Sequence, residues 1–492
     1  MIPKIRLHPK NDRPVRPDGR YVVYWMNAAR RPVWNYGLEY AVAKAVELGK
    51  PLIVVEALSC SYPWASDRHH AFVMDGMAAN AKHFAGTAVS YFPYVEAQLG
   101  AGRGLHMALA EDACLYVTDE WPCFIVPAWV AKVAAQVAVS MIAVDSSGLW
   151  PIAATERVFT TAYSFRAHLQ KNLVPHLFDA PRPDPLSGVR LPPLEIPRRI
   201  LDRWQPYDPV LGHRLLAELP IDHDVSVVVD HPGGFRAGAE KLKIFVNERL
   251  AGYAERSRVD KSLASGLSGH LHYGHTSPHE ILASIADHEG WSPNDLDETG
   301  AGGKRQGWWS LSAAAEGFMD ELVTWRELGL NFGHLRPETY DRFDSLPDWA
   351  RKTMAEHQAD ERPTTYTAKQ FEEAQTHDEL WNAAQVQLRR EGIIQNYLRM
   401  LWGKKIYHWS KTPREALDTM IELNNRWAID GRDPNSYSGI FWVLGRYDRA
   451  WGPEREIFGK LRYMTSESTA RKFRTKDYVE RYSPAKQPKL FE

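Results

Sequence analysis

The first third of the chain alternates short hydrophobic runs with amphipathic stretches. Five runs rich in Val, Ile and aromatic residues are typical of buried strands: 21–26, 52–58, 88–95, 114–119 and 140–145. Between them, segments such as 37–50 and 71–86 repeat hydrophobic residues with the period of a helix. This alternation predicts an α/β domain built on a doubly wound parallel sheet.

The loop after the first predicted strand lacks the glycine fingerprint G-x-G-x-x-G. The sequence there is YWMNAARRPVW, residues 24–34. The fingerprint lets a backbone turn approach a pyrophosphate closely, so an ordinary dinucleotide site at this position is disfavoured.

The hydrophobic pattern changes after a proline-rich stretch at 179–199, which predicts an extended connector. Beyond about residue 205, strand signals nearly vanish and helical segments run to the end. We therefore predict three parts: an α/β domain (1–178), the connector (179–205) and an all-α domain (206–492). Within the last part, 290–310 reads as an exposed loop.

Composition narrows the class of protein. The 492 residues are 44% hydrophobic and 25% charged, as in a globular protein with a sizeable core. No apolar run reaches the length of a membrane span, and the N-terminus has no secretory pattern, so we expect a cytoplasmic protein without a membrane partner. The three cysteines form no CxxC pair, so neither a disulfide framework nor a zinc knuckle is predicted.

The charge distribution indicates that any nucleic acid would bind to one local basic region and not to the protein surface as a whole. The net charge of the whole chain is −1, whereas 441–492 has 12 Lys and Arg against 7 Asp and Glu, a net charge of +5. A basic segment of this kind favours phosphate contacts, although a solvated basic tail is equally compatible with charge alone.

Four histidines fall in GHLHYGHTSPHE, residues 269–280. Their spacing does not match HExxH, so no metal is expected. The preceding SGLSG (265–269) leads small hydroxyl residues into a helix, where backbone N–H groups can hold phosphate.

Three tryptophans lie close together in stretches with helical patterns: Trp381, Trp402 and Trp409. Trp402 and Trp409 are seven apart and share a helix face, with Arg399 close to it. On spacing alone, such aromatic residues are more often core than an electron path.

Five segments together make the sequence resemble the photolyases, and most of all the class II cyclobutane pyrimidine dimer photolyases. They are SGLSGHLHYGHTSP (265–278), THDELWNAAQ (376–385), YLRMLWGKKIYHW (397–409), LNNRWAIDGRDPN (423–435) and DRAWGPEREIFGKLRYM (448–464). The resemblance implies an all-α domain that binds FAD, and light-driven splitting of pyrimidine dimers flipped out of DNA. It also implies a possible antenna chromophore of the deazaflavin type, and we expect a monomer.

The resemblance assigns roles around the flavin. Tyr253, Ser265, Leu267 and Ser268 match positions around the FAD phosphates. Arg399 and Asp430 match an ion pair beside the isoalloxazine, and Asn424 matches the residue that faces flavin N5. Trp402, Trp381 and Trp409, in that order outward, match the chain that returns electrons to an oxidised flavin.

It also assigns roles at the lesion. Glu321 matches the carboxyl group that hydrogen-bonds the dimer, for which it must be protonated. Trp325, one turn further on, and Trp442 would stack on the dimer, and Met400 would pack against it. Arg449 and Arg462 match residues that fill the gap or contact the strands.

Three departures from the class II pattern stand out. They are the segment NAARRPVWNYGL (27–38), which puts an antenna in doubt, a 441–451 segment one residue shorter before Asp448, and the 290–310 insertion.

Alternatives of other classes remain. A flavin blue-light receptor would keep the tryptophans without needing Glu321 or Trp325. A (6-4) photolyase would present a histidine where Met400 stands, and a plain DNA-binding module would not explain Arg399, Asp430 and Asn424 together.

Overall fold

The computed structural model describes residues 2–483 and divides them into two compact units. Unit 1 comprises residues 1–156, 171–247 and 266–296, and unit 2 comprises 157–170, 248–265 and 297–492. Each unit therefore draws on several segments, and the three-part division predicted from the proline-rich stretch stays a prediction. No helix among residues 2–483 is long and apolar enough to cross a membrane.

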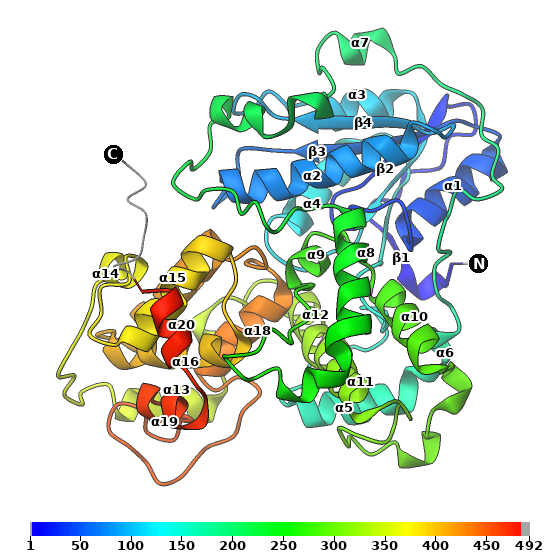
Figure 1. The fold of residues 1–492 in the computed structure, drawn as a ribbon. Helices are drawn as coiled ribbons and strands as arrows, with labels where there is room; N and C mark the ends of the chain where they lie inside the picture. The colour runs from blue at the N-terminus through cyan, green and yellow to red at the C-terminus, as the bar shows by residue number, and fades with distance from the viewer. Residues whose placement is uncertain (1, 484–492) are drawn as a thin grey trace. The chain divides into compact units, whose positions relative to one another are not determined.

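Unit 1 is built on a six-stranded sheet (Figure 1). Its spatial order is β1-β6-β5-β2-β3-β4, and every pair is parallel except β1 with β6. The strands are β1 (Leu7–Pro9), β2 (Tyr21–Trp25), β3 (Leu52–Leu58), β4 (Ser90–Val95), β5 (Ala113–Asp119) and β6 (Met141–Val144). The five predicted strands are confirmed, whereas the short edge strand β1 was missed.

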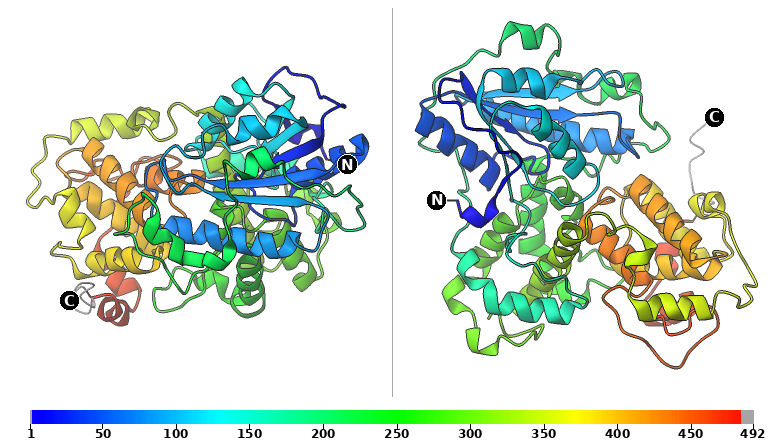
Figure 2. Two further views of the ribbon diagram at one scale, coloured as in Figure 1. Left: turned by 90° about the horizontal axis from the view of Figure 1, so that it is seen from above. Right: turned by 180° about the vertical axis from the view of Figure 1, so that it is seen from behind.

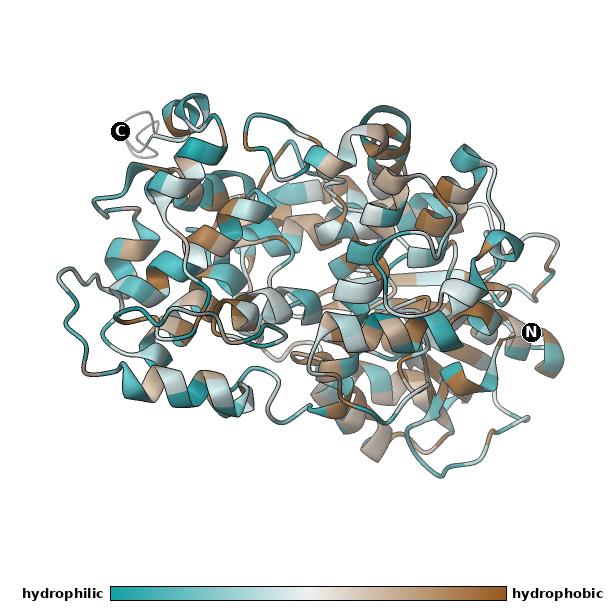
Figure 3. Cartoon of the chain, turned by 90° about the horizontal axis from the view of Figure 1, so that it is seen from below, coloured by the Kyte–Doolittle hydropathy of each residue, from teal (hydrophilic) through white to brown (hydrophobic). Residues whose placement is uncertain are grey.

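Helices cover both faces of the sheet. One hydrophobic core joins it to α3, α4 and α7, and the other joins it to α1 and the end of α2. Figure 3 shows hydrophobic strands between helices that carry hydrophilic residues as well. The helices of unit 1 include α1 (Tyr36–Leu48), α2 (Asp67–Phe84), α3 (Leu105–Glu111), α4 (Val126–Gln136), α6 (Val174–Leu177), α7 (Arg198–Leu201), α8 (Phe235–Ile244), α9 (Ser268–His272) and α10 (Pro278–Glu289). The doubly wound prediction is thus confirmed.

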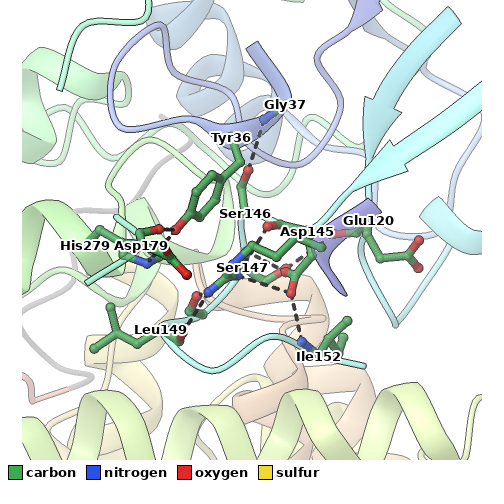
Figure 4. Close-up of polar contacts among 12 residues, drawn as sticks. Tyr36, Gly37, Glu120, Asp145, Ser146, Ser147, Leu149, Ile152, Asp179 and His279 are labelled. Atoms are coloured by element: carbon green, nitrogen blue, oxygen red, sulfur yellow. Dashed lines mark hydrogen bonds and ion pairs between the residues drawn. The ribbon is translucent and has the colours of Figure 1, made fainter. Parts of the chain in front are cut away.

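A buried polar cluster joins the N-terminal segment of unit 1 to the end of the sheet (Figure 4). Asp145 accepts hydrogen bonds from the Ile152 N–H (2.8 Å) and from the Arg6 guanidinium (3.4 Å), and both charged side chains are almost fully buried. The Tyr36 hydroxyl lies 3.5 Å from Nε2 of His279, on α10. A buried charge is tolerated only with partners, so this cluster fixes the segments that meet there.

The regular elements among the described residues of unit 2 are all helices, as the sequence predicted, with isolated β-bridges such as the one between Arg455 and Gly459. In Figures 1 and 2 these elements run from teal (α5) through green to red. They include α5 (Ala162–Asn172), η4 (Leu250–Glu255), α11 (Ala313–Met319), η7 (Asp320–Trp325), α12 (Arg326–Leu335), α13 (Asp348–Glu356), α14 (Ala368–Glu372), α15 (Glu379–Glu391), α16 (Asn396–Trp409), α17 (Pro413–Trp427), α18 (Pro434–Val443), α19 (Ser466–Lys472) and α20 (Lys476–Arg481).

The 290–310 segment is largely an exposed loop, as predicted, and holds only two short 3-10 helices, η5 (Pro293–Asp295) and η6 (Glu298–Gly300). Three of its side chains are nevertheless buried, those of Trp291, Trp308 and Trp309, whereas residues 304–307 form a fully exposed turn. The Gly and polar residues of the segment predicted its exposure, but they did not reveal the burial of these three rings, which large aromatic side chains favour.

Candidate functional site

Helix α16 is the element around which most of the expected site residues gather. The Gln395 side chain caps its first turn by accepting a hydrogen bond from the Leu398 N–H, and α15, α17 and α18 all pack against it. Along its length it carries Arg399, Met400, Trp402 and Trp409.

Arg399 and Asp430 form the expected ion pair. Nη2 of Arg399 lies 3.0 Å from Oδ1 of Asp430, and Nη1 lies 3.3 Å from Oδ2. Asp430 stands in the tight turn between α17 and α18, where a Cβ on Gly431 would lie 2.6 Å from the carbonyl oxygen of Asn424. The close approach explains why a glycine follows the aspartate.

Asn424 and the next residue, Asn425, are both buried amide side chains. Nδ2 of Asn424 donates to Oγ of Ser436 at 2.8 Å, and the neighbouring Asn425 accepts a hydrogen bond from the Arg432 N–H at 2.9 Å. These contacts fix the orientation of the Asn424 amide, a group that can both donate and accept hydrogen bonds.

The three tryptophans are buried, and Trp381 contacts each of the other two residues. Nε1 of Trp381 donates to the backbone oxygen of Trp402 at 3.0 Å, and the Trp381 and Trp409 rings lie 6.0 Å apart. Asp378 positions Trp381 by capping α15, which Gly392 ends in the left-handed conformation. Trp381 therefore contacts the backbone of Trp402 and the ring of Trp409.

Glu321 forms an ion pair with Arg256, a residue that the sequence reasoning missed. Nη2 of Arg256 donates to Oε1 of Glu321 at 2.6 Å, and the same guanidinium lies over the Tyr253 ring. Gln395 holds the backbone oxygen of Arg256 at 2.9 Å. Burial raises the pKa of Glu321, and the charge and hydrogen bond of Arg256 oppose that rise without cancelling it.

Glu321 and Trp325 lie on η7, which is a π-helix rather than the α-helix that was assumed. The Arg326 N–H donates to the carbonyl oxygen of Glu321, five residues earlier. Both side chains are half-buried, as is Met400 on α16. A π turn inserted between α11 and α12 is a local feature that helical periodicity does not reveal.

A second cluster surrounds Trp442. The Arg462 guanidinium lies over its ring at 5.0 Å and pairs with Asp448 at 3.1 Å. The buried Lys404 ammonium bonds to the backbone oxygen of Val443, and burial lowers the pKa of Lys404 to about 7. Arg449 is exposed and lies over Trp451.

The residues expected at the FAD phosphates fall in both units. Tyr253, which is buried, and Ser265, which is half-buried, belong to unit 2. Leu267 is buried and Ser268 is exposed at the start of α9, in unit 1. No group of three or more potential metal ligands comes together in residues 2–483.

Arg256 and Lys404 carry no sequence signal of their own. Arg256 meets Glu321 across 65 positions of the chain, and Lys404 looks like any helical lysine until its burial is known. Arg256 could have been suggested only by the general rule that a buried carboxyl group, as expected for Glu321, has a cation nearby.

The sheet of unit 1 has a switch point between β2 and β5, where a doubly wound fold binds a ligand. The backbone N–H groups of Asn27, Ala28 and Ala29 point there, but all three donate to Oδ2 of Asp119 at 2.8–2.9 Å. The Tyr24 hydroxyl donates a hydrogen bond to Oδ1 of Asp119 at 2.6 Å. These backbone donors are therefore paired with the Asp119 carboxylate within the chain.

Comparisons with known proteins agree with this arrangement. The chain is 34% identical over 470 residues to a deoxyribodipyrimidine photo-lyase of Methanothermobacter thermautotrophicus, covering 94% of both chains. The chain belongs to the deoxyribodipyrimidine photo-lyase family. It is also 31% identical to photo-lyases of Potorous tridactylus (94% of this chain, 81% of the relative) and Oryza sativa (96% and 88%).

The fold agrees with the family as well. A crystal structure of a bacterial class III photolyase from Agrobacterium tumefaciens superposes with a TM-score of 0.67 at 18% identity, covering 96% of this chain and 90% of that chain. No protein-family model matches the chain. Photo-lyases are flavoproteins. The buried Asn424 amide on α17, together with the Arg399–Asp430 pair from α16 and the turn after α17, is a donor and acceptor set suited to a flavin ring.

Proposed function

We propose that this photo-lyase is of class II and repairs DNA by splitting cyclobutane pyrimidine dimers in the light, with FAD as its cofactor. The observation that carries the proposal is the gathering of the Arg399–Asp430 pair, the tryptophan row and the Glu321 carboxyl around α16 in one helical unit. The proposed reaction is taken from the relatives, which are named deoxyribodipyrimidine photo-lyases.

Arg399, Asp430 and Asn424 would hold the isoalloxazine, and Tyr253 and Ser265 would serve the phosphate side together with Leu267 and Ser268. Reduced FAD, when bound, supplies an electron on absorbing light. Because the charges of Arg399 and Asp430 are paired at 3.0 Å, removing either one would leave the other buried alone.

Glu321 would bind the dimer through a protonated carboxyl group. Its pKa is raised by burial, which favours the neutral acid that can donate a hydrogen bond. The half-buried rings of Trp325 and Trp442 offer stacking surfaces for a flipped-out pyrimidine dimer, and Met400 offers an adaptable apolar contact.

Arg449 and Arg462 would contact the DNA strands around the lesion. Arg449 is exposed, and Arg462 is held by Asp448 beside Trp442. Positive side chains at fixed positions are suited to phosphate oxygens, which fix the register of a protein on DNA.

The test is repair of a duplex that carries one thymine dimer by the reduced protein under blue light. We expect the undamaged strand to be restored only in the light, and the Glu321→Ala variant to bind flavin but repair poorly. A protein that binds and photoreduces flavin without any repair would instead act as a light receptor.

A further inference from the structure

A short exposed turn beside the Glu321 segment is held rigidly at both ends. Its exposed residues are Lys304, Arg305 and Gln306, and Gly303 and Gly307 flank them, both in the left-handed region with φ of +85° and +90°. Only glycine adopts such angles freely, so the conformation of the turn is encoded in the sequence.

The first end of the turn is fixed to α5. The Gly303 N–H donates to Oε1 of Gln170 at 2.6 Å, and Nε2 of Gln170 donates to the Lys304 oxygen at 2.8 Å. A Cβ on Gly303 would lie 3.0 Å from the ring of Tyr163 and 3.1 Å from Cβ of Ala167, which leaves no room for another residue.

The second end is fixed to the helix that leads to Glu321. The Gly307 N–H donates to Oε2 of Glu316, on α11, at 2.6 Å. The Trp308 side chain that follows is 2% exposed. The turn is therefore anchored on the same continuous helical run, α11 and η7, that carries Glu321.

Arg166 connects the turn to that run a second time. It forms a bidentate ion pair with Asp320 at 2.6 and 2.9 Å, and its Nη1 also donates to the Gly303 oxygen at 3.3 Å. The charge of Arg305 also lowers the pKa of Glu321, opposing the larger effect of burial, so this cation acts on the carboxyl expected at the lesion.

We propose that Lys304 and Arg305 form a preorganised phosphate clamp for the DNA strand that carries the dimer. This inference rests on the proposed function and adds to it a contact surface in the 290–310 insertion. The acidic residues of the insertion, Asp295, Asp297 and Glu298, all precede the turn. The turn itself, 303–307, carries two cations and no acidic residue, which complements a phosphate backbone. A turn that is already ordered loses little conformational entropy when it binds.

The test measures DNA binding in the dark, where no repair occurs. A Lys304→Gln/Arg305→Gln variant is compared with wild type by fluorescence anisotropy, on a duplex with one thymine dimer and on the same undamaged duplex, over a series of salt concentrations. The matched control is Lys82→Gln/Lys132→Gln, which removes two exposed cations from α2 and α4 of unit 1. Flavin content checks the fold of each variant.

We expect the turn variant to weaken binding to both duplexes by the same factor, about 5- to 20-fold for two exposed phosphate contacts. We also expect it to reduce the slope of log K against log salt by about 1 to 2. The control should change neither. Wild-type affinity and slope in the turn variant would overturn the inference.

A second variant tests the anchoring of the turn. Gly303→Val keeps both charges but forces the turn away from Tyr163 and Ala167, so we expect lower affinity for both duplexes. If Gly303→Val binds both duplexes with wild-type affinity, the fixed conformation of the turn does not contribute to DNA binding, and that part of the inference is wrong. Failure of the proposed function itself is distinguishable, because wild type would then neither prefer the damaged duplex nor repair it in the light.

Discussion

Among single residues, Glu321 is subject to two opposing influences on its pKa. Burial raises it, and the Arg256 guanidinium at 2.6 Å lowers it. Arg256→Met removes the larger of the two cationic influences that oppose burial, so we expect the pKa of Glu321 to rise further. If repair needs the protonated acid, it will then persist to higher pH. The measurement is the initial rate of light-dependent repair from pH 5.5 to 9.

The matched control for this prediction is Arg258→Met. Arg258 stands two residues away and pairs with Asp260 at the surface, not with Glu321. Its profile should coincide with that of wild type. If the pH profile of Arg256→Met also coincides with that of wild type, Arg256 does not control the protonation of Glu321 and the prediction is wrong.

Lys404 links stability to pH. Burial lowers its folded-state pKa to about 7, whereas an exposed lysine in the unfolded chain titrates near 10.4. Between these values the unfolded state binds one more proton, so the free energy of unfolding rises with pH, by up to about 1.4 kcal/mol per unit. Lys404→Met should remove this rise. Denaturant midpoints at pH 6.5, 7.5, 8.5 and 9.5 measure it, and equal slopes in both proteins would refute it.

At the scale of elements, α15 and α16 place the three tryptophans in contact. Trp381 touches both Trp402 and Trp409, so Trp381→Phe should interrupt the row and slow photoreduction of oxidised flavin to a small fraction of the wild-type rate. Repair by protein reduced chemically beforehand should be unchanged. Absorbance during illumination, with a reductant present, measures the first effect.

The matched control for the row is Trp427→Phe. This buried tryptophan on α17 donates to Glu372 and stacks with arginines, outside the row. It should photoreduce like wild type. Wild-type photoreduction in Trp381→Phe would show that electrons take another path.

Elements differ in how well the sequence predicts them, for physical reasons. The five strands β2 to β6 were predicted because burial on both faces leaves continuous hydrophobic runs. The edge strand β1 was missed because its three residues, LHP, are only partly buried and include a proline. The Arg399–Asp430 pair followed from the resemblance to a family, but Arg256 was missed because a contact between distant segments has no local pattern.

At the scale of the whole molecule, we expect light to be collected by the flavin alone. The switch point of the sheet, where a second chromophore would bind, has its three backbone donors taken by Asp119. Releasing them would leave buried N–H groups without partners, which costs free energy that a bound anion would have to repay. The action spectrum of repair should therefore coincide with the absorption of reduced flavin.

Reconstitution provides the sharper form of this prediction. Purified protein incubated with a deazaflavin should gain no absorption band after gel filtration, and its repair rate at wavelengths absorbed by the deazaflavin should not increase. A retained band that raises the repair rate would contradict the prediction. Asp119 would then have to give up its three donors on binding, and Asp119→Asn, a weaker acceptor for those N–H groups, would be expected to retain the deazaflavin more tightly than wild type does.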